Sequence, residues 1–230
     1  MTSGCKVLFG ATVFLASSFA QTYAGVVIGG TRLIYDGARK EATISVINAE
    51  KNTPYLLQGW VENARASDTS KPSFIVTPPL FRLDGGKENM IRILRTGGNL
   101  PTDRESLYWF SIKAIPATKK TDENQLLISV KSRLKLIYRP ANIQGDPDLA
   151  WKKVIFTRSG NMLSASNPTP FYISFHTVKA GIQEVNLHDA ATLAPMSTLS
   201  WKLPSGAGEP VKWKVINDYG GITEEFSNPQ

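Results

Sequence analysis

From residue 26 onward, short apolar segments alternate with turn-forming residues, and this alternation limits the possible folds more than any other feature. The turns include Asp36-Gly37, Pro78-Pro79 and Gly97-Gly98-Asn99. No segment keeps a 3.6-residue period long enough for a major helix. Strands are predicted at residues 26–28, 33–35, 43–48, 55–62, 74–77, 89–94, 108–115 and 126–138. Short strands at this spacing predict an all-β, immunoglobulin-like sandwich, with Trp60 suited to its core.

A polar segment divides this first set of strands from a second one. Residues 141–149 (ANIQGDPDL) contain Gly145 and Pro147 and show no periodicity, so we expect a linker there. Further strands are predicted at residues 153–156, 162–165, 171–178, 181–187, 199–203 and 211–217. The sequence therefore predicts two β-sandwich domains, at residues 25–144 and 145–230.

The first two dozen residues have a different pattern from the rest of the chain. Lys6 supplies a positive charge, residues 7–19 are mostly apolar, and small residues suited to cleavage end at Ala20 or Ala24. This pattern indicates a secretory signal peptide over residues 1–24, and it is too short to span a membrane comfortably. We therefore expect an exported, soluble protein without membrane insertion.

Cysteine and histidine usage argues against most catalytic sites. The only cysteine, Cys5, lies in the signal segment, so the mature chain has no disulfide and depends on apolar burial for stability. The two histidines, His176 and His188, have no metal-ligand spacing, and His176 is expected at a surface or groove position. No Gly-x-Ser-x-Gly, Walker or dinucleotide pattern occurs. We therefore predict no enzyme activity, no metal and no cofactor.

The net charge is +7, but its basic residues are scattered along the chain. No nucleic-acid motif is present, and aromatic residues are not interleaved with a basic run. A solvated basic surface is the simpler interpretation, and no nucleic-acid partner is expected. A localised basic site for a carboxylate or another anion is compatible with the same composition.

Residues 125–140 (QLLISVKSRLKLIYRP) predict an edge strand with one apolar face. Leu126, Ile128 and Val130 have one parity, and Pro140 ends the strand. The alternation leaves open which face turns inward, because Leu127 and Ile137 are apolar on the other parity.

Several motifs together resemble one known family, the periplasmic pilus-assembly chaperones of the chaperone–usher system. The densest match is LPTDRESLYWFSIKAIPA at residues 100–117, where Ser111 replaces the asparagine usual in the family and leaves a local hydrogen bond in doubt. The remaining matches are Thr31-Arg32, KLIYRP at 135–140, NPTPFY at 167–172 and NDYGG at 217–221. The resemblance covers essentially the whole mature chain. It implies two immunoglobulin-like domains in an L-shaped or boomerang arrangement.

The resemblance also implies roles for individual residues. Arg32 and Lys135 would bind the C-terminal carboxylate of a pilus subunit, although either residue alone is more often a solvated surface charge. Leu126, Ile128 and Val130 would be lent to the subunit as a donor strand, the alternative being that they fill the core of their own domain. Glu105, Arg139 and Asp218 would form an ionic network between the domains.

The implied function is that of a periplasmic chaperone. It would bind, fold and stabilise pilus subunits and deliver them to an outer-membrane usher, with weak self-association of the free protein as a further expectation. The short connection at residues 116–124 resembles the class that serves rod-forming pili with adhesive tips. One alternative is a pilus structural subunit or adhesin, which would need an incomplete fold or a free N-terminal extension, and usually a disulfide. A periplasmic enzyme or sugar-binding domain is a third class.

Overall fold

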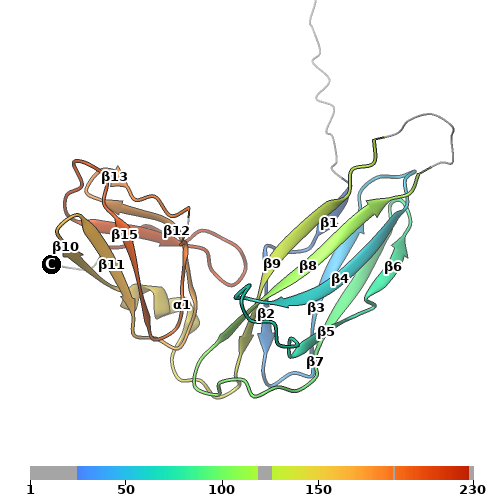
Figure 1. The fold of residues 1–230 in the computed structure, drawn as a ribbon, viewed down its shortest axis with the longest axis horizontal. Helices are drawn as coiled ribbons and strands as arrows, with labels where there is room; N and C mark the ends of the chain where they lie inside the picture. Colours follow the sequence, from blue (N-terminus) through green and yellow to red (C-terminus); the bar gives the residue numbers. More distant parts are fainter. Residues whose placement is uncertain (1–24, 119–125, 189, 228–230) are drawn as a thin grey trace, which may run out of the picture.

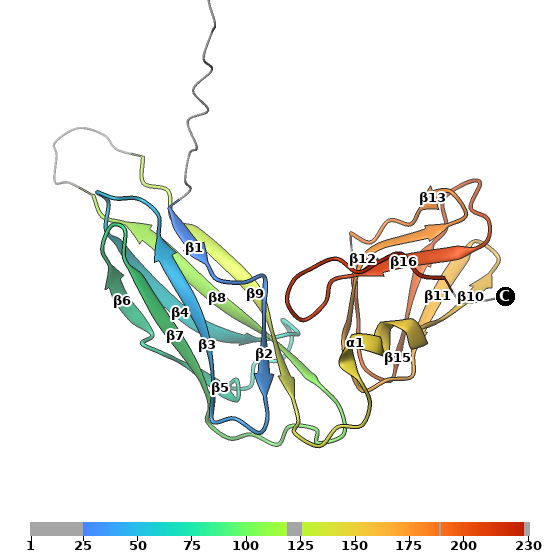
Figure 2. The same cartoon turned by 180° about the vertical axis from the view of Figure 1, so that it is seen from behind.

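The computed structural model describes residues 25–118, 126–188 and 190–227, and it contains two β-sandwich domains. The predicted signal peptide and most of the predicted connection at residues 116–124 lie outside the described residues. Figures 1 and 2 show the two sandwiches inclined to one another and joined at one end, with the chain crossing once between them. The predicted fold of two immunoglobulin-like sandwiches is confirmed.

The first sandwich consists of a four-stranded and a five-stranded sheet. The four-stranded sheet has the order β1 (Val26–Ile28), β3 (Glu41–Asn48), β7 (Glu88–Arg95), β5 (Phe74–Thr77). The five-stranded sheet has the order β2 (Arg32–Asp36), β9 (Val130–Arg139), β8 (Ser106–Pro116), β4 (Tyr55–Asn63), β6 (Leu80–Leu83). Neighbouring strands are antiparallel except β2 and β9, which are parallel.

Period-two alternation places one face of each strand in the core. On β3, Ile44 and Val46 are buried while Thr43 and Ile47 face outward. Phe110 and Leu136 meet them from the opposite sheet. Trp60 does not join this core, so that expectation was wrong. It has the opposite parity to the buried Leu57 and lies half-buried on the outer face of β4.

In the first sandwich, the structure adds one strand to those predicted and shortens another. Strand β6 was missed because it has only four residues and follows two prolines taken as a turn. Strand β9 begins at Val130 rather than at residue 126. Its register pairs Val130 with Ala114, so continuing it would place Ile128 opposite Pro116, which has no N–H to donate. The strand ends at Arg139, directly before Pro140, as expected.

The second sandwich is smaller and has its own core. One sheet has the order β10 (Ile155–Ser159), β11 (Met162–Asn167), β15 (Ser197–Lys202). In the other sheet, β12 (Ile173–Ala180) pairs with β13 (Gln183–Glu184), β14 (Thr192–Leu193) and β16 (Val211–Val215). Aromatic rings fill the space between the sheets, with Phe156 and Phe226 packed against Trp213. Of the strand predicted at 181–187, only β13 forms, and β14 was missed because it has two residues.

The predicted linker contains the start of a helix. Helix α1 (Pro147–Ala150) is followed by a 3₁₀ turn, η1 (Trp151–Lys153). The Asp146 carboxylate accepts a hydrogen bond from the Asp148 N–H at 2.9 Å, and Pro147 stands at the first helical position. This Asp-Pro pair is a helix-start signal that the absence of periodicity concealed.

Candidate functional site

Arg32 and Lys135 lie side by side where the two domains meet. The parallel pairing of β2 with β9 makes them direct cross-strand partners. Arg32 Nη1 donates a hydrogen bond to the Ile216 carbonyl oxygen at 2.9 Å. Lys135 Nζ donates to Ser174 Oγ at 2.9 Å and to Thr192 Oγ1 at 2.6 Å. Arg32 and Lys135 of the first domain therefore both donate to neutral acceptors on the second domain.

These two cations are partly desolvated. Burial, and to a smaller extent the neighbouring charge of Arg32, lowers the pKa of Lys135 to about 8. Burial also lowers the pKa of Arg32, against the opposing effect of Asp218. Arg32 Nε is buried without a hydrogen-bond partner among the described residues. A positive charge held here by neutral groups favours an anion as ligand.

A hollow of about 450 Å³ opens beside Arg32. Lys135 is not among its lining residues, but its hydrogen-bond partner Ser174 is. The lining comes from β2, α1, η1, β12 and the segment around β16, and includes Arg32, Asp148, Trp151, Tyr172, Ser174, Asn217 and Asp218.

The apolar residues at the start of the β9 segment are exposed. The exposed fraction is 88% for Leu126, 65% for Ile128 and 60% for Val130. Ile128 and Val130 line a groove of about 260 Å³ together with Val26 and Ile28 of β1. Val130 has the same parity as the buried Leu134 of β9, and Ile128, which precedes the strand, lines the same groove. Both therefore face the open side between the two sheets, where no strand among the described residues covers them. They do not fill the core of their own domain.

One edge of β9 is also unpaired in this region. Strand β2 pairs with β9 only from Lys135 to Arg139. On its other edge, β9 pairs with β8 from Val130 onward. From Val130 to Leu134, no described strand occupies the edge that faces away from β8, so its backbone groups are open to a further strand.

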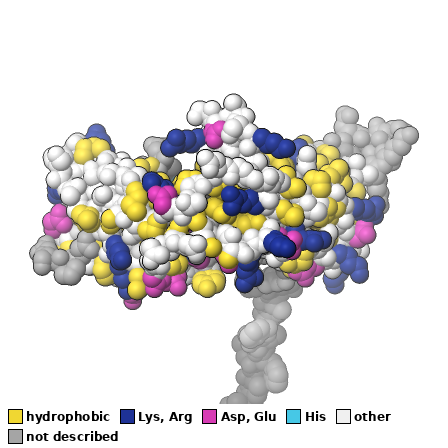
Figure 3. Space-filling view, turned by 90° about the horizontal axis from the view of Figure 1, so that it is seen from below, with side chains coloured by type: hydrophobic (Ala, Val, Ile, Leu, Met, Phe, Trp, Pro, Cys, Tyr) yellow, Lys and Arg dark blue, Asp and Glu magenta, His cyan; other side chains and the backbone are white. Residues whose placement is uncertain are grey.

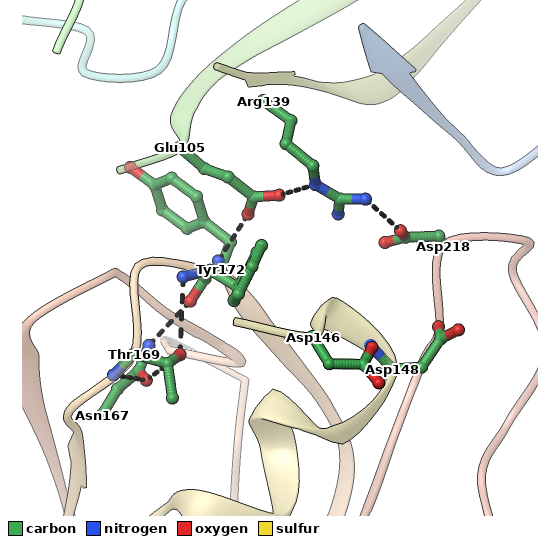
Figure 4. A network of polar contacts seen from close by, with 9 residues as sticks. Glu105, Arg139, Asp146, Asp148, Asn167, Thr169, Tyr172 and Asp218 are labelled. Carbon is green, nitrogen blue, oxygen red and sulfur yellow. Dashed lines mark hydrogen bonds and ion pairs between the residues drawn. The ribbon is translucent and has the colours of Figure 1, made fainter. Parts of the chain in front are cut away.

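The predicted ionic network of Glu105, Arg139 and Asp218 forms and joins both domains through Arg139 (Figure 4). Arg139 Nε lies 2.7 Å from Glu105 Oε1, and Arg139 Nη1 lies 2.8 Å from Asp218 Oδ2. Glu105 Oε2 accepts a hydrogen bond from the Tyr172 backbone N–H at 2.6 Å. Burial raises the pKa of the Glu105 carboxyl, while Arg139 and the Tyr172 N–H act in the opposite direction. The Arg139 guanidinium thus contacts Glu105 of the first domain and Asp218 of the second, and Glu105 in turn binds the backbone of Tyr172 in the second domain.

The turn that presents Tyr172 is itself held by side chains, as Figure 4 shows. Asn167 Oδ1 accepts hydrogen bonds from the Thr169 N–H at 3.0 Å and from Thr169 Oγ1 at 2.7 Å. Asn167 Nδ2 donates to the Phe171 carbonyl oxygen at 2.8 Å. This explains why asparagine and threonine occupy the NPTPFY segment, because both satisfy backbone groups in a buried turn.

A polar cluster on the outer face of the five-stranded sheet was not anticipated. Ser111 Oγ donates to Glu62 Oε2 at 2.5 Å, so serine keeps a hydrogen bond at the position where the family usually has asparagine. This bond is the main cause that lowers the pKa of Glu62, with Lys131 adding to it. Lys131 lies over the ring of Trp60 and Arg133 over the ring of Trp109. These contacts hold the outward side chains of β9.

Ser174, Thr192 and the Ile216 carbonyl were also missed as site groups. Tyr172 was noted only as the end of the NPTPFY motif. A serine and a threonine on short strands carry no local signal, because hydroxyl residues are common on half-buried sheet faces. A backbone carbonyl has no signature at all.

The histidines do not form a recognisable site. His176 is exposed on β12, as expected, and His188 is exposed beyond β13. Within residues 25–118, 126–188 and 190–227, no group of three or more His, Cys, Asp or Glu side chains is arranged to hold a metal ion. In the same ranges, no helix is long and apolar enough to cross a membrane.

Two family models match the chain in succession. Residues 25–144 match the model of the pili and flagellar-assembly chaperone PapD N-terminal domain. Residues 149–227 match the model of the pili assembly chaperone PapD C-terminal domain.

Individual known proteins are similar over nearly their whole length. The chain is 43% identical over 225 residues to chaperone protein FimC of Escherichia coli (strain K12), covering 96% of this chain and 91% of FimC. A solved complex of Salmonella enterica SafA pilin with the SafB chaperone is similar with a TM-score of 0.80 and 35% identity, covering 91% of this chain and 98% of the other. The crystal structure of the periplasmic chaperone SfaE is similar with a TM-score of 0.75 and 38% identity. The match covers 87% of this chain and 97% of SfaE.

Proposed function

This chain belongs to the family of pili assembly chaperones, and on that premise we propose that it captures pilus subunits in the periplasm and delivers them to an outer-membrane usher. It completes the fold of each subunit by lending a strand, and it uses no catalytic step and no cofactor. Residues 1–24 are removed on export, and the mature chain divides into domains after residue 144. The short connection at residues 116–124 supports a place in the class that serves rod-forming pili.

The observation that carries this proposal is the cation pair Arg32 and Lys135. Two adjacent positive charges, partly desolvated and hydrogen-bonded to neutral acceptors, suit a carboxylate that arrives from outside. The C-terminal carboxylate of a subunit supplies such a group. Binding it at this point sets the register of the subunit along β9, because Lys135 lies on that strand.

The donor residues are Leu126, Ile128 and Val130. They are exposed, share one parity and stand beside a free strand edge, which are the requirements for adding a strand to another sheet. Full burial of each side chain in a subunit groove contributes about 1.5–3 kcal/mol. Main-chain hydrogen bonds along the edge add to this without depending on subunit sequence.

Glu105, Arg139 and Asp218 set the angle between the domains in this proposal. Their contacts connect the residue before β8, the end of β9 and the segment after β16. A buried ion pair is better suited to specifying one geometry than to adding stability. The geometry in question is the position of Ser174 and Ile216 relative to Lys135 and Arg32.

Co-expression with candidate pilins, followed by a periplasmic pull-down, tests the proposal. We expect Arg32→Ala and Lys135→Ala each to abolish subunit recovery while the chaperone stays folded. Losing one anchor costs roughly 2–5 kcal/mol of binding free energy, because the carboxylate is left unpaired. Lys202→Ala, which removes an exposed cation of the second domain, is the matched control and should recover subunit normally. Normal subunit recovery with both Arg32 and Lys135 replaced would show that these residues do not anchor the subunit carboxylate.

A further inference from the structure

Two cross-strand pairs face each other at the domain junction. Arg32 and Lys135 are partners across β2 and β9 in the first domain. Ser174 and Thr192 are partners across β12 and β14 in the second domain. The second pair directs both of its hydroxyl oxygens at the ammonium of Lys135.

This arrangement uses two of the three donors of the ammonium group. A lysine ammonium has three N–H bonds and no acceptor. One donates to Ser174 Oγ at 2.9 Å and one to Thr192 Oγ1 at 2.6 Å, which leaves one N–H for another acceptor. The long lysine side chain is otherwise flexible, so two fixed acceptors determine where that last N–H points.

The chemistry of the acceptors matters as much as their position. Among the described residues, no acidic side chain forms an ion pair with Lys135, and Ser174 is only 3% exposed. A carboxylate at either position would hold the ammonium but cancel its charge. A hydroxyl holds the ammonium and leaves its charge available to a ligand.

We propose that Ser174 and Thr192 are positioning residues for Lys135, so that the anchor for the subunit carboxylate is completed by the second domain. The inference rests on the proposed function, because it assumes that Lys135 binds a carboxylate. It explains why the anchor lies at the junction: the cation comes from one domain and its orientation from the other. The interdomain angle then controls anchor strength through these two hydrogen bonds.

The titration of Lys135 gives a readout that a purely structural role would not change. The groups that act on its ammonium are the charge of Arg32 on β2 and the hydroxyls of Ser174 on β12 and Thr192 on β14. Hydroxyl acceptors favour the charged form. Removing both should therefore lower the pKa of Lys135 below its value of about 8 in the wild-type protein.

The experiment uses the full mature chain with Ser174→Ala, Thr192→Val and their combination. The pKa of Lys135 is measured by NMR of its side chain in the free protein. Affinity is measured for a synthetic peptide that copies the C-terminus of the pilin recovered in the pull-down, made with a free carboxylate and as the amide. We expect the double variant to lose at least tenfold in carboxylate-dependent affinity, because hydrogen bonds to a charged group are lost. The pKa of Lys135 should fall.

Two control variants separate positioning from folding. Thr192→Ser keeps the hydroxyl and should stay within about twofold of wild type, since only a methyl group is lost. Ser200→Ala removes an exposed hydroxyl that bonds to Ser164 at 2.8 Å in the same domain, and it should change neither readout.

The outcomes distinguish the two proposals. If wild-type protein binds the acid and the amide equally, the carboxylate anchor is wrong, and the Lys135 pKa in the free protein still decides the positioning role. If wild type prefers the acid and the double variant keeps both this preference and the wild-type pKa, the positioning role of Ser174 and Thr192 is overturned.

Discussion

At the scale of single residues, Lys135 carries its positive charge in a partly buried position next to a second cation, Arg32. Burial and the neighbouring Arg32 lower the pKa of its ammonium to about 8. A carboxylate beside it would favour the charged form and raise the pKa again. The complex therefore holds a proton in a pH range where the free chaperone has released it.

We expect the affinity for a subunit carboxylate to fall as the pH rises through about 8. Below that value Lys135 is charged in both states, and affinity should be nearly constant. Above it, binding must recover a proton, so affinity falls by up to about tenfold per pH unit. Calorimetry with a C-terminal pilin peptide between about pH 6.5 and 9.5 measures this.

The matching variant is Lys135→Arg. Arginine stays charged throughout this range, so the inflection near pH 8 should disappear even if the overall affinity changes. The amidated peptide should show no inflection with either protein. A flat profile for the wild-type protein and the free-acid peptide would contradict the prediction.

At the scale of the secondary-structure element, the two edges of β9 differ, and its outward face carries its own contacts. Its outward side chains Lys131 and Arg133 lie over Trp60 and Trp109 and share Glu62. One edge is paired with β8, and the other is open before Lys135. Figure 3 shows one face of the molecule, on which basic side chains are spread among hydrophobic and acidic ones. The strand is thus held from one edge and one face.

Replacing Ile128 and Val130 with serine should weaken subunit capture without unfolding the chaperone. Both side chains are exposed in the free protein, so its free energy of unfolding should change by at most about 0.5 kcal/mol per substitution. Each lost side chain should remove up to about 1.5–3 kcal/mol of binding free energy. Pilin recovery and thermal unfolding of the free chaperone are the two measurements.

Ile182→Ser is the control for this pair. Ile182 is 90% exposed in the second domain, so its replacement removes a similar apolar surface away from β9. It should leave pilin recovery unchanged. If the Ile128 and Val130 double variant recovers as much pilin as the wild type, the donor-strand role of these residues is wrong.

At the scale of the whole molecule, the segment after β16 holds the two domains together. Ile216 accepts from Arg32, and Asp218 pairs with Arg139. Gly220 has a φ of +85° and approaches Thr31 so closely that a Cβ there would collide with its hydroxyl. This explains the glycine in NDYGG, since no other residue combines that conformation with that contact.

Arg139→Ala should destabilise the protein and impair subunit binding together. The Glu105 side chain is 1% exposed, so it would keep a buried charge without its ion partner, at a cost of roughly 3–5 kcal/mol. Because burial raises the pKa of Glu105, losing Arg139 would raise it further, and protonation would relieve the cost. The destabilisation should therefore be larger at neutral pH than at mildly acidic pH. Thermal unfolding at both pH values measures it.

Arg82→Ala provides the comparison for this network. Arg82 pairs with Asp84 at 2.7 Å, but both side chains are mostly exposed, so its loss should cost about 0–1 kcal/mol. If Arg139→Ala keeps wild-type stability and wild-type pilin recovery, the proposal that the ionic network sets the interdomain angle is wrong.

Local patterns predicted the elements better than they predicted the site. The strands at 55–62 and 74–77 were found within one residue because alternation is a property of neighbouring positions. Helix α1 was missed although Asp146 and Pro147 mark its start. Trp60 was placed on the wrong face because alternation defines two faces without saying which is inside. Arg32 and Lys135 were singled out by family resemblance and not by any pattern.

The sequence by itself determined an all-β chain of two sandwiches, because strand periodicity and turn residues are encoded locally. Only the tertiary structure decided the facing of Leu126, Ile128 and Val130, which depends on where β8 ends and on the gap beside β1. It also decided that Arg32 and Lys135 are neighbours, since that follows from a parallel pairing of distant strands. The hydroxyls of Ser174 and Thr192 reach Lys135 only because the two domains are held at one angle. Pairing and docking are non-local, so no window of sequence contains them.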